Sequence, residues 1–412
     1  MEQKIYDEYV EILKEELLPA MGCTEPIAVA YAAAVAVQAL GEKPESVEVN
    51  VSANIIKNVK SVVVPCTGGL RGIGAAVCAG IVAGCPEKEL EILEEITGEQ
   101  KVEMKKMLDT MPMTIRESDK EYIFDIQIKA CAGGHSGYVE IAGFHTNVIC
   151  VKKDDEIIRE KAYEEQGSSC ATDRSLLTVE KIIEFADCVD VADVEEVLQR
   201  QIDYNWAIAE EGMTGNWGAA IGKTLMEAYG NSVHNRAKAM AAAGSDARMN
   251  GCELPVVINS GSGNQGMTTS LPVIVYAKEL NVSKEMMLRA LVVSNLITIH
   301  MKTGIGRLSA YCGAISAGCG AGAGICYLYG GRAYEISHVI VNAVAINSGV
   351  VCDGAKASCA AKIASAVEAG LLGLQMQKNG KQFYGGDGLV EKGVENTIRN
   401  IGELAKKGMR ET

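Results

Sequence analysis

The chain has 412 residues, 48% hydrophobic and 22% charged, which excludes a largely disordered protein and allows two or three domains with a sizeable core. Its net charge of −14 argues against a nucleic-acid partner, because the phosphate backbone would repel it. The opening residues lack the basic and apolar regions of a secretory signal, so we expect a cytoplasmic protein whose fourteen cysteines stay reduced.

The first part of the chain mixes helical and strand-like patterns. In chain order the expected elements are a helix over 2–18, a second over 27–40, valine-rich strands over 46–54 and 61–65, a helix from about 74 to 84 after a glycine-rich turn, and a charged helical segment over 87–110. Strands are then expected within 121–158, with a turn at Gly133 and Gly134.

From about Leu176 onward the pattern is nearly all helical, with glycine-rich joints. We therefore predict an α+β fold with an α+β domain over residues 1–165, which includes N-terminal helices, and a mostly all-α, Gly/Ala-rich domain over 170–412. The segment Glu164–Asp173 is the expected linker. The uncharged stretch 308–331 holds seven glycines, so we expect a buried helical hairpin there and no membrane span.

Several familiar motifs fail in this sequence. Gly261–Gly266 matches G-x-G-x-x-G, but the pattern that follows is helical and lacks the βαβ unit of a dinucleotide site. Backbone N–H groups at the start of a helix nevertheless bind small anions such as a carboxylate, so this loop is a candidate substrate site. The absence of C-x-x-C and H-E-x-x-H excludes zinc ribbons, thioredoxin motifs and zincins.

The candidate ligands of a metal cluster are Cys312, Cys352 and Cys359. Cys312, Cys319 and Cys326 on one helix would span roughly 21 Å, too far for a single cluster. Cys352 lies before an Asp-Gly turn and Cys359 lies two expected helical turns later, so both could join Cys312 around one cubane. Three thiolates would leave one iron open as a Lewis acid. Buried small side chains on packed helices are the alternative interpretation of cysteines spaced by seven.

Four separate features together resemble the L-cysteine desulfidase family, which is related to the iron–sulfur L-serine dehydratases. They are PAMGCTEP at 19–26, NIIKNVKSVVVPCTGG at 54–69, SGSGNQG at 260–266, and the spacings of forty and seven residues that separate Cys312, Cys352 and Cys359. The likeness covers nearly the whole chain.

The resemblance implies a 4Fe–4S cluster held by Cys312, Cys352 and Cys359, and a catalytic base at Cys23. It also implies substrate binding by Asn58 and by four residues of the loop, which are Ser262, Gly263, Asn264 and Gln265. Cys23 stands at an expected helix start, where backbone amides favour a thiolate and Glu25 opposes it, so its net pKa stays open.

The expected activity is that of an oxygen-sensitive carbon–sulfur lyase. It would convert the small amino acid L-cysteine, with water, to pyruvate, ammonia and hydrogen sulfide by α,β-elimination. Two alternatives remain open: an L-serine dehydratase on the same scaffold, and a non-catalytic iron–sulfur or thiol sensor. The sequence also leaves open whether the chain forms a homo-oligomer.

Overall fold

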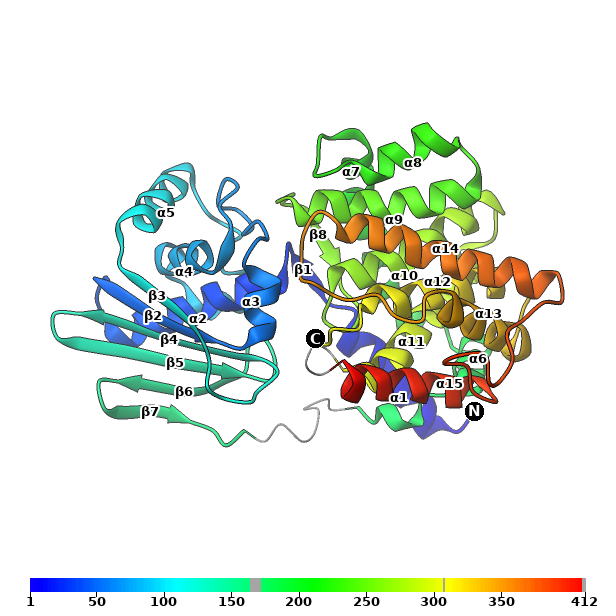
Figure 1. Ribbon diagram of the computed structural model, residues 1–412, viewed down its shortest axis with the longest axis horizontal. Coiled ribbons are helices and arrows are strands. Elements are labelled where there is room, and N and C mark those ends of the chain that lie inside the picture. Colours follow the sequence, from blue (N-terminus) through cyan, green and yellow to red (C-terminus); the bar gives the residue numbers. More distant parts are fainter. Residues whose placement is uncertain (164–171, 307, 410–412) are drawn as a thin grey trace.

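The structure is a computed structural model that describes residues 1–163, 172–306 and 308–409. It has a sheet-containing part and a helical part, which lie side by side in Figure 1. The predicted α+β class is confirmed. Most of the expected linker, Glu164–Asp173, falls outside the described residues.

The sheet of the first part has six strands in the order β3-β2-β4-β5-β6-β7, and only β2 and β3 run parallel. The strands are β2 (Ser46–Val51), β3 (Met113–Glu117), β4 (Asp125–Ala132), β5 (His135–Ala142), β6 (Val148–Lys153) and β7 (Glu156–Glu160). Gly133 and Gly134, both at positive φ, close the predicted turn between β4 and β5. The two edge strands, β3 and β7, escaped prediction because they are mostly exposed and need no alternation of apolar residues.

Helices α2 (Thr24–Leu40) and α4 (Gly72–Ala83) pack closely together in the hydrophobic core of this part, and α2 also contacts the sheet. A Cβ on Gly80 would lie 1.9 Å from the carbonyl oxygen of Ala30, so the α2–α4 contact requires glycine. The remaining elements of this part are α3 (Ala53–Val59), η1 (Pro86–Glu91) and α5 (Gly98–Thr110).

Two expectations for this part are wrong. Residues 61–65 form turns and one isolated bridge, although Val62 and Val64 are fully buried. Their apolar character therefore reflects burial alone and not a place in a sheet. Residues 87–110 are not one helical segment, because they break between η1 and α5, where Thr97 caps α5 with a capping box.

The second part is helical, as predicted. Its elements are η2 (Arg174–Leu176), α6 (Val179–Cys188), α7 (Ala192–Thr214), α8 (Ile221–Tyr229), α9 (Val233–Met249), α10 (Gly263–Glu279), α11 (Lys284–Ile305), α12 (Gly313–Leu328), α13 (Ala333–Ile346), α14 (Cys359–Lys378), α15 (Val394–Glu403) and η3 (Leu404–Gly408). The N-terminal helix α1 (Gln3–Glu16) packs into the core of this part, and β1 (Pro19–Met21) pairs with β8 (Pro255–Val257). The division into domains over residues 1–165 and 170–412 stays a prediction, and the structure packs residues 3–21 against the helical part.

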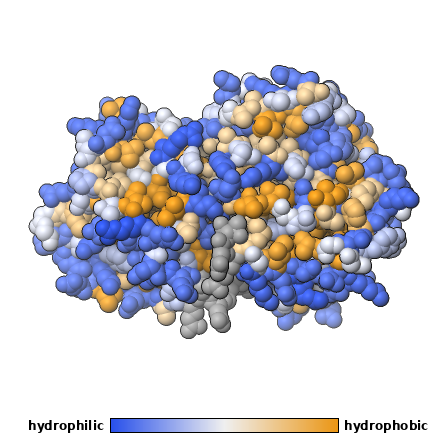
Figure 2. Space-filling model, in the orientation of Figure 1, coloured by the Kyte–Doolittle hydropathy of each residue, from blue (hydrophilic) through white to orange (hydrophobic). Residues whose placement is uncertain are grey.

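The glycine-rich stretch 308–331 forms one buried helix, α12, and not the expected hairpin. A Cβ on Gly318 would lie 2.2 Å from the carbonyl oxygen of Ala366 in α14, so glycine here serves close helix packing and does not interrupt the helix. In the described part of the chain, no helix has the length and hydropathy needed to cross a membrane. Figure 2 shows hydrophobic patches on both parts within a mostly hydrophilic surface.

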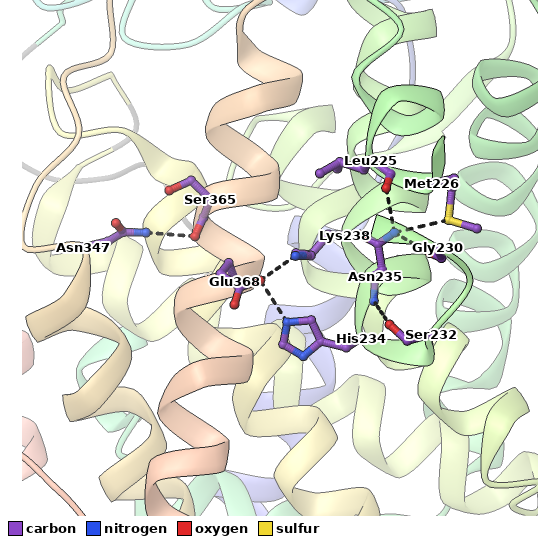
Figure 3. A network of polar contacts seen from close by, with 10 residues as sticks. All are labelled: Leu225, Met226, Gly230, Ser232, His234, Asn235, Lys238, Asn347, Ser365 and Glu368. Atoms are coloured by element: carbon purple, nitrogen blue, oxygen red, sulfur yellow. Dashed lines mark hydrogen bonds and ion pairs between the residues drawn. The ribbon is translucent and has the colours of Figure 1, made fainter. Parts of the chain in front are cut away.

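A polar network on the helical part ties α9 to α14 (Figure 3). The Glu368 carboxylate of α14 accepts from His234 at 2.9 Å and pairs with Lys238 at 2.6 Å, both on α9. The hydrogen bond from His234 contributes most to lowering the pKa of Glu368, with Lys238 also acting and partial burial opposing. The network fixes two helices whose ends, Arg248 and Cys359, line the site described next.

Candidate active site

A cavity of about 130 Å³ lies between the sheet-containing part and the helical part. Every residue predicted for the site lines it except Gly263; the predicted residues that line it are Cys23, Asn58, Ser262, Asn264, Gln265, Cys312, Cys352 and Cys359. Segments separated by more than 300 residues in sequence are therefore brought to one place.

Four helix N-termini meet at this cavity. Cys23 is the N-cap of α2, Ser262 is the N-cap of α10, Cys312 is the N-cap of α12, and Cys359 is the first residue of α14. Each N-terminus presents unpaired backbone N–H groups and the positive end of a helix dipole. These N-termini therefore favour a bound anion in the cavity, even though the chain as a whole is acidic.

Cys312 and Cys352 are held beside each other by two short antiparallel segments. The Cys312 N–H donates to the Val350 carbonyl at 2.9 Å, and the Cys352 N–H donates to the Ala310 carbonyl at 2.7 Å. The Cys312 thiol also donates a hydrogen bond to the Cys352 sulfur.

This hydrogen bond is the main cause that lowers the pKa of Cys352, and the backbone N–H of Gly354 and the charges of Lys57 and Lys302 assist it against burial. The same hydrogen bond, followed by burial, raises the pKa of Cys312. Within the pair, Cys352 therefore ionises more readily than Cys312.

The third thiol, Cys359, lies on the same cavity, with its sulfur 3.6 Å from the Gly354 carbonyl oxygen. We expected a helix that begins near residue 355 and places Cys359 about two helical turns after Cys352, but α14 begins at Cys359 itself. Residues 353–358 form an irregular loop in which Gly354 has a φ of +101°. Cys319 and Cys326 are buried along α12 and do not line the cavity.

The three thiols have the donor chemistry of an iron–sulfur cluster site. Among the residues that the structure describes, no three His, Cys, Asp or Glu side chains are placed to bind a single metal ion. The ligands of an iron–sulfur cluster can lie farther apart than those of a single metal ion, because each thiolate binds a different iron. The nearby cations Lys57, Lys302 and Lys362 would balance the negative charge of such a group.

Cys23 belongs to a compact polar group with Glu25 and Asn58. The Cys23 thiol donates to Glu25 Oε2 at 3.1 Å, and the Asn58 amide donates to Glu25 Oε1 at 3.1 Å. Burial, followed by the charge of Glu25, raises the pKa of Cys23 well above its usual range, and the opposing charge of Arg248 is weaker. The sequence left this direction open, and the structure decides it in favour of the protonated thiol.

The pKa of Glu25 is lowered, despite burial, by the charge of His145, the hydrogen bond from Cys23 and the charge of Arg248. Glu25 is therefore a carboxylate that accepts the thiol hydrogen of a neighbour. This pair was not expected to act together, since Glu25 was noted only as an opposing charge.

The loop before α10 is strained and firmly held. Ser260 has a φ of +50°, which costs about 1–3 kcal/mol for a residue with a side chain. Its hydroxyl donates to Asn259 at 2.9 Å, and the Asn259 amide donates to the buried Asn295 side chain at 2.9 Å. A buried chain of amides thus fixes the loop that was predicted to bind substrate.

Sequence patterns missed His145 and Arg248, two side chains that line this cavity, and indicated Lys302 only as a residue that could lie near it. Lys302 is buried, and burial lowers its pKa to about 8 against the influence of Cys312 and Cys352. Its ammonium donates to the Gly306 carbonyl at 2.6 Å. His145 and Arg248 lie in no recognisable motif, so only the fold brings them here.

Comparison with known proteins gives one family model and several full-length relatives. The model described as the serine dehydratase alpha chain matches residues 87–412, which include the three cluster-type cysteines and the loop before α10. A UPF0597 protein of Desulfitobacterium hafniense is 59% identical over 411 residues, covering 100% of this chain and 96% of the relative. UPF0597 proteins of Lachnoclostridium phytofermentans and Bacteroides fragilis are 50% and 36% identical, with at least 95% of each chain covered.

Proposed function

Because the chain belongs to the serine dehydratase alpha chain family, we propose that it is an iron–sulfur lyase that converts L-cysteine to pyruvate, ammonia and hydrogen sulfide. The observation that carries this proposal is that three thiols and the Cys23–Glu25 pair line one cavity of about 130 Å³. A sensor would need no such substrate-sized space beside its thiols, so the cavity supports an enzyme.

Cys312, Cys352 and Cys359 would hold a 4Fe–4S cluster. When bound, a cluster with three protein thiolates leaves one iron open to act as a Lewis acid toward the leaving group. The lowered pKa of Cys352 favours the thiolate form that such binding needs. The pKa values of Cys312 and Cys359 are raised, by the hydrogen bond to Cys352 and by burial respectively, so these two thiols would lose their protons on binding. We expect the enzyme to be cytoplasmic and sensitive to oxygen.

Cys23 is the proposed base that removes the α-proton of the substrate. In the free protein its thiol is protonated, so its proton must first leave to the solvent by way of the Glu25 carboxylate, which already accepts its hydrogen bond at 3.1 Å. Asn58 holds the other oxygen of that carboxylate and fixes its orientation. After elimination, the aminoacrylate tautomerises to an imine, which water hydrolyses to pyruvate and ammonia.

L-Serine is the second candidate substrate, and the name of the matching family favours it. We prefer L-cysteine because a thiolate is a softer ligand for iron in a sulfur-rich site and a better leaving group, since a thiol pKa is about 8.5 and that of an alcohol is far higher.

The substrate choice predicts a clear kinetic result. The anaerobic, iron-replete enzyme should form pyruvate from L-cysteine with a kcat/KM well above that for L-serine, and L-serine should inhibit competitively. The measurement is pyruvate formation with each amino acid, with sulfide determined in parallel. Faster pyruvate formation from L-serine would replace the desulfidase assignment with the dehydratase.

A second prediction concerns the pH profile. Since the Cys23 thiol must lose its proton and its pKa is raised, kcat/KM should rise toward alkaline pH. Glu25→Gln removes a negative charge that raises the pKa of Cys23, so the rise of kcat/KM with pH should occur at lower pH in this variant. The maximal rate should fall, because the proton acceptor of Cys23 is lost. If kcat/KM rises at the same pH in the variant and the wild type, Glu25 does not control the ionisation of Cys23.

A further inference from the structure

Arg248 is a buried cation with no matching carboxylate among the described residues. It lies in the last turn of α9, is 4% exposed and lines the cavity. Its Nη1 donates to the neutral Asn264 side chain at 3.2 Å, and its Nε is buried with no hydrogen-bond partner in the described part of the chain. A buried guanidinium without an anion is costly, so this position calls for an anionic ligand.

Two other cations of the cavity, Lys302 and Lys362, already have partners. Lys362 pairs with Asp353 and donates to the Val351 carbonyl at 2.9 Å, and Lys302 donates to the Gly306 carbonyl. Lys57 and Lys302 act on the pKa of Cys352, whereas Arg248 acts on the pKa values of Cys23, Glu25 and Cys359. Arg248 therefore lies within reach of both the proposed base and the third thiol.

Glu25 does not serve as the missing anion. Both of its carboxylate oxygens already accept hydrogen bonds, one from Asn58 and the other from Cys23 and Thr24. No ion pair joins Glu25 to Arg248 among the described residues.

Gly263 explains how the guanidinium fits. A Cβ at this position would lie 2.4 Å from Arg248 Nε and 2.8 Å from Arg248 Cζ, so the guanidinium rests directly against the start of α10. A side chain at residue 263 would displace it. The predicted contribution of Gly263 to substrate binding is thus indirect, through the space it leaves for Arg248.

We propose that Arg248, with Asn264 and the N-terminus of α10, binds the α-carboxylate of the substrate and restricts the site to ligands that carry this group. A guanidinium presents a planar fork of donors that matches a carboxylate, and the helix N-terminus adds positive potential. The carboxylate then lies beside Cys23, and the β-substituent extends toward the thiols. The inference rests on the proposed function, because it concerns the substrate of that same site.

The test uses two small thiols that each lack one substrate group. 3-Mercaptopropionate keeps the carboxylate and lacks the amine, and cysteamine keeps the amine and lacks the carboxylate. Binding of each to the anaerobic, iron-replete protein is measured by calorimetry, and kcat/KM for L-cysteine is measured separately. Iron content and the melting temperature are determined for every variant.

Arg248→Gln should weaken 3-mercaptopropionate binding by about 10²–10³-fold, leave cysteamine binding unchanged and lower kcat/KM for L-cysteine by a similar factor. Arg248→Lys should restore part of the loss, because it keeps the charge without the fork. Arg289→Gln is the matched control, since Arg289 donates to the Ala186 carbonyl on α6 and lies away from the cavity. Its binding of both thiols should match that of the wild type.

Unchanged 3-mercaptopropionate binding in Arg248→Gln would overturn the inference, and so would a loss of iron in both Arg248 variants, which would assign Arg248 to the cluster. If the wild type forms no pyruvate from any amino acid while Arg248→Gln still loses 3-mercaptopropionate binding, the proposed function fails and the carboxylate site stands.

Discussion

Replacing Cys352 with serine is expected to abolish the iron–sulfur cluster and, with it, all pyruvate formation. Cys352 is the thiol whose pKa is lowered by the hydrogen bond from Cys312 and by nearby positive charge, so it is the best preformed thiolate of the three. Serine is a poor ligand for iron in a thiolate site. The measurement is iron and labile sulfide per chain after anaerobic purification.

Cys319→Ser is the matched control for this variant. Cys319 is a buried cysteine on α12, seven residues from Cys312, and it does not line the cavity. We expect this variant to keep wild-type iron per folded chain. Iron at the wild-type level in Cys352→Ser would refute the ligand assignment, whereas iron loss in both variants would point to a general effect on the fold.

Cys23→Ala is expected to lower kcat by about 10²–10⁴-fold, the usual effect of removing a general base, while iron content stays normal. The reason is its place at the start of α2, with its thiol 3.1 Å from a carboxylate that can take its proton. The measurement combines pyruvate formation with iron content on the same preparation.

Cys78→Ala provides the comparison, because Cys78 is fully buried in α4 and lies away from the cavity. Its kcat should equal that of the wild type. A Cys23→Ala variant with normal turnover would remove Cys23 from the mechanism, and one that also lost iron would make Cys23 a cluster ligand.

The sequence predicts the fold class because burial leaves a periodic pattern in elements such as α1 and β4. Prediction from sequence fails where a segment is buried without pairing in a sheet, or pairs in a sheet without being buried. Val62 and Val64 are buried without a strand, and β7 is a strand without burial. In α12 the glycines that suggested a break are the contacts that let three helices approach closely.

The candidate site is partly predictable for a similar reason. Cys23, Cys312 and Cys359 lie in local motifs or spacings, and the structure places all three on one cavity. Arg248 and His145 lie in no motif, because their roles depend on where α9 and the segment after β5 end in space. Cys359 was assigned to the wrong part of its helix, since sequence pattern alone did not reveal how far the loop after Gly354 extends.

The most direct test of the proposed function is a single anaerobic preparation in which iron, labile sulfide and the products formed from L-cysteine are all measured. The proposal predicts about four iron and four labile sulfide per chain, with pyruvate, ammonia and hydrogen sulfide formed in equal amounts. A chain that forms these products without iron, or that binds a full cluster and forms no pyruvate from L-cysteine, would contradict it.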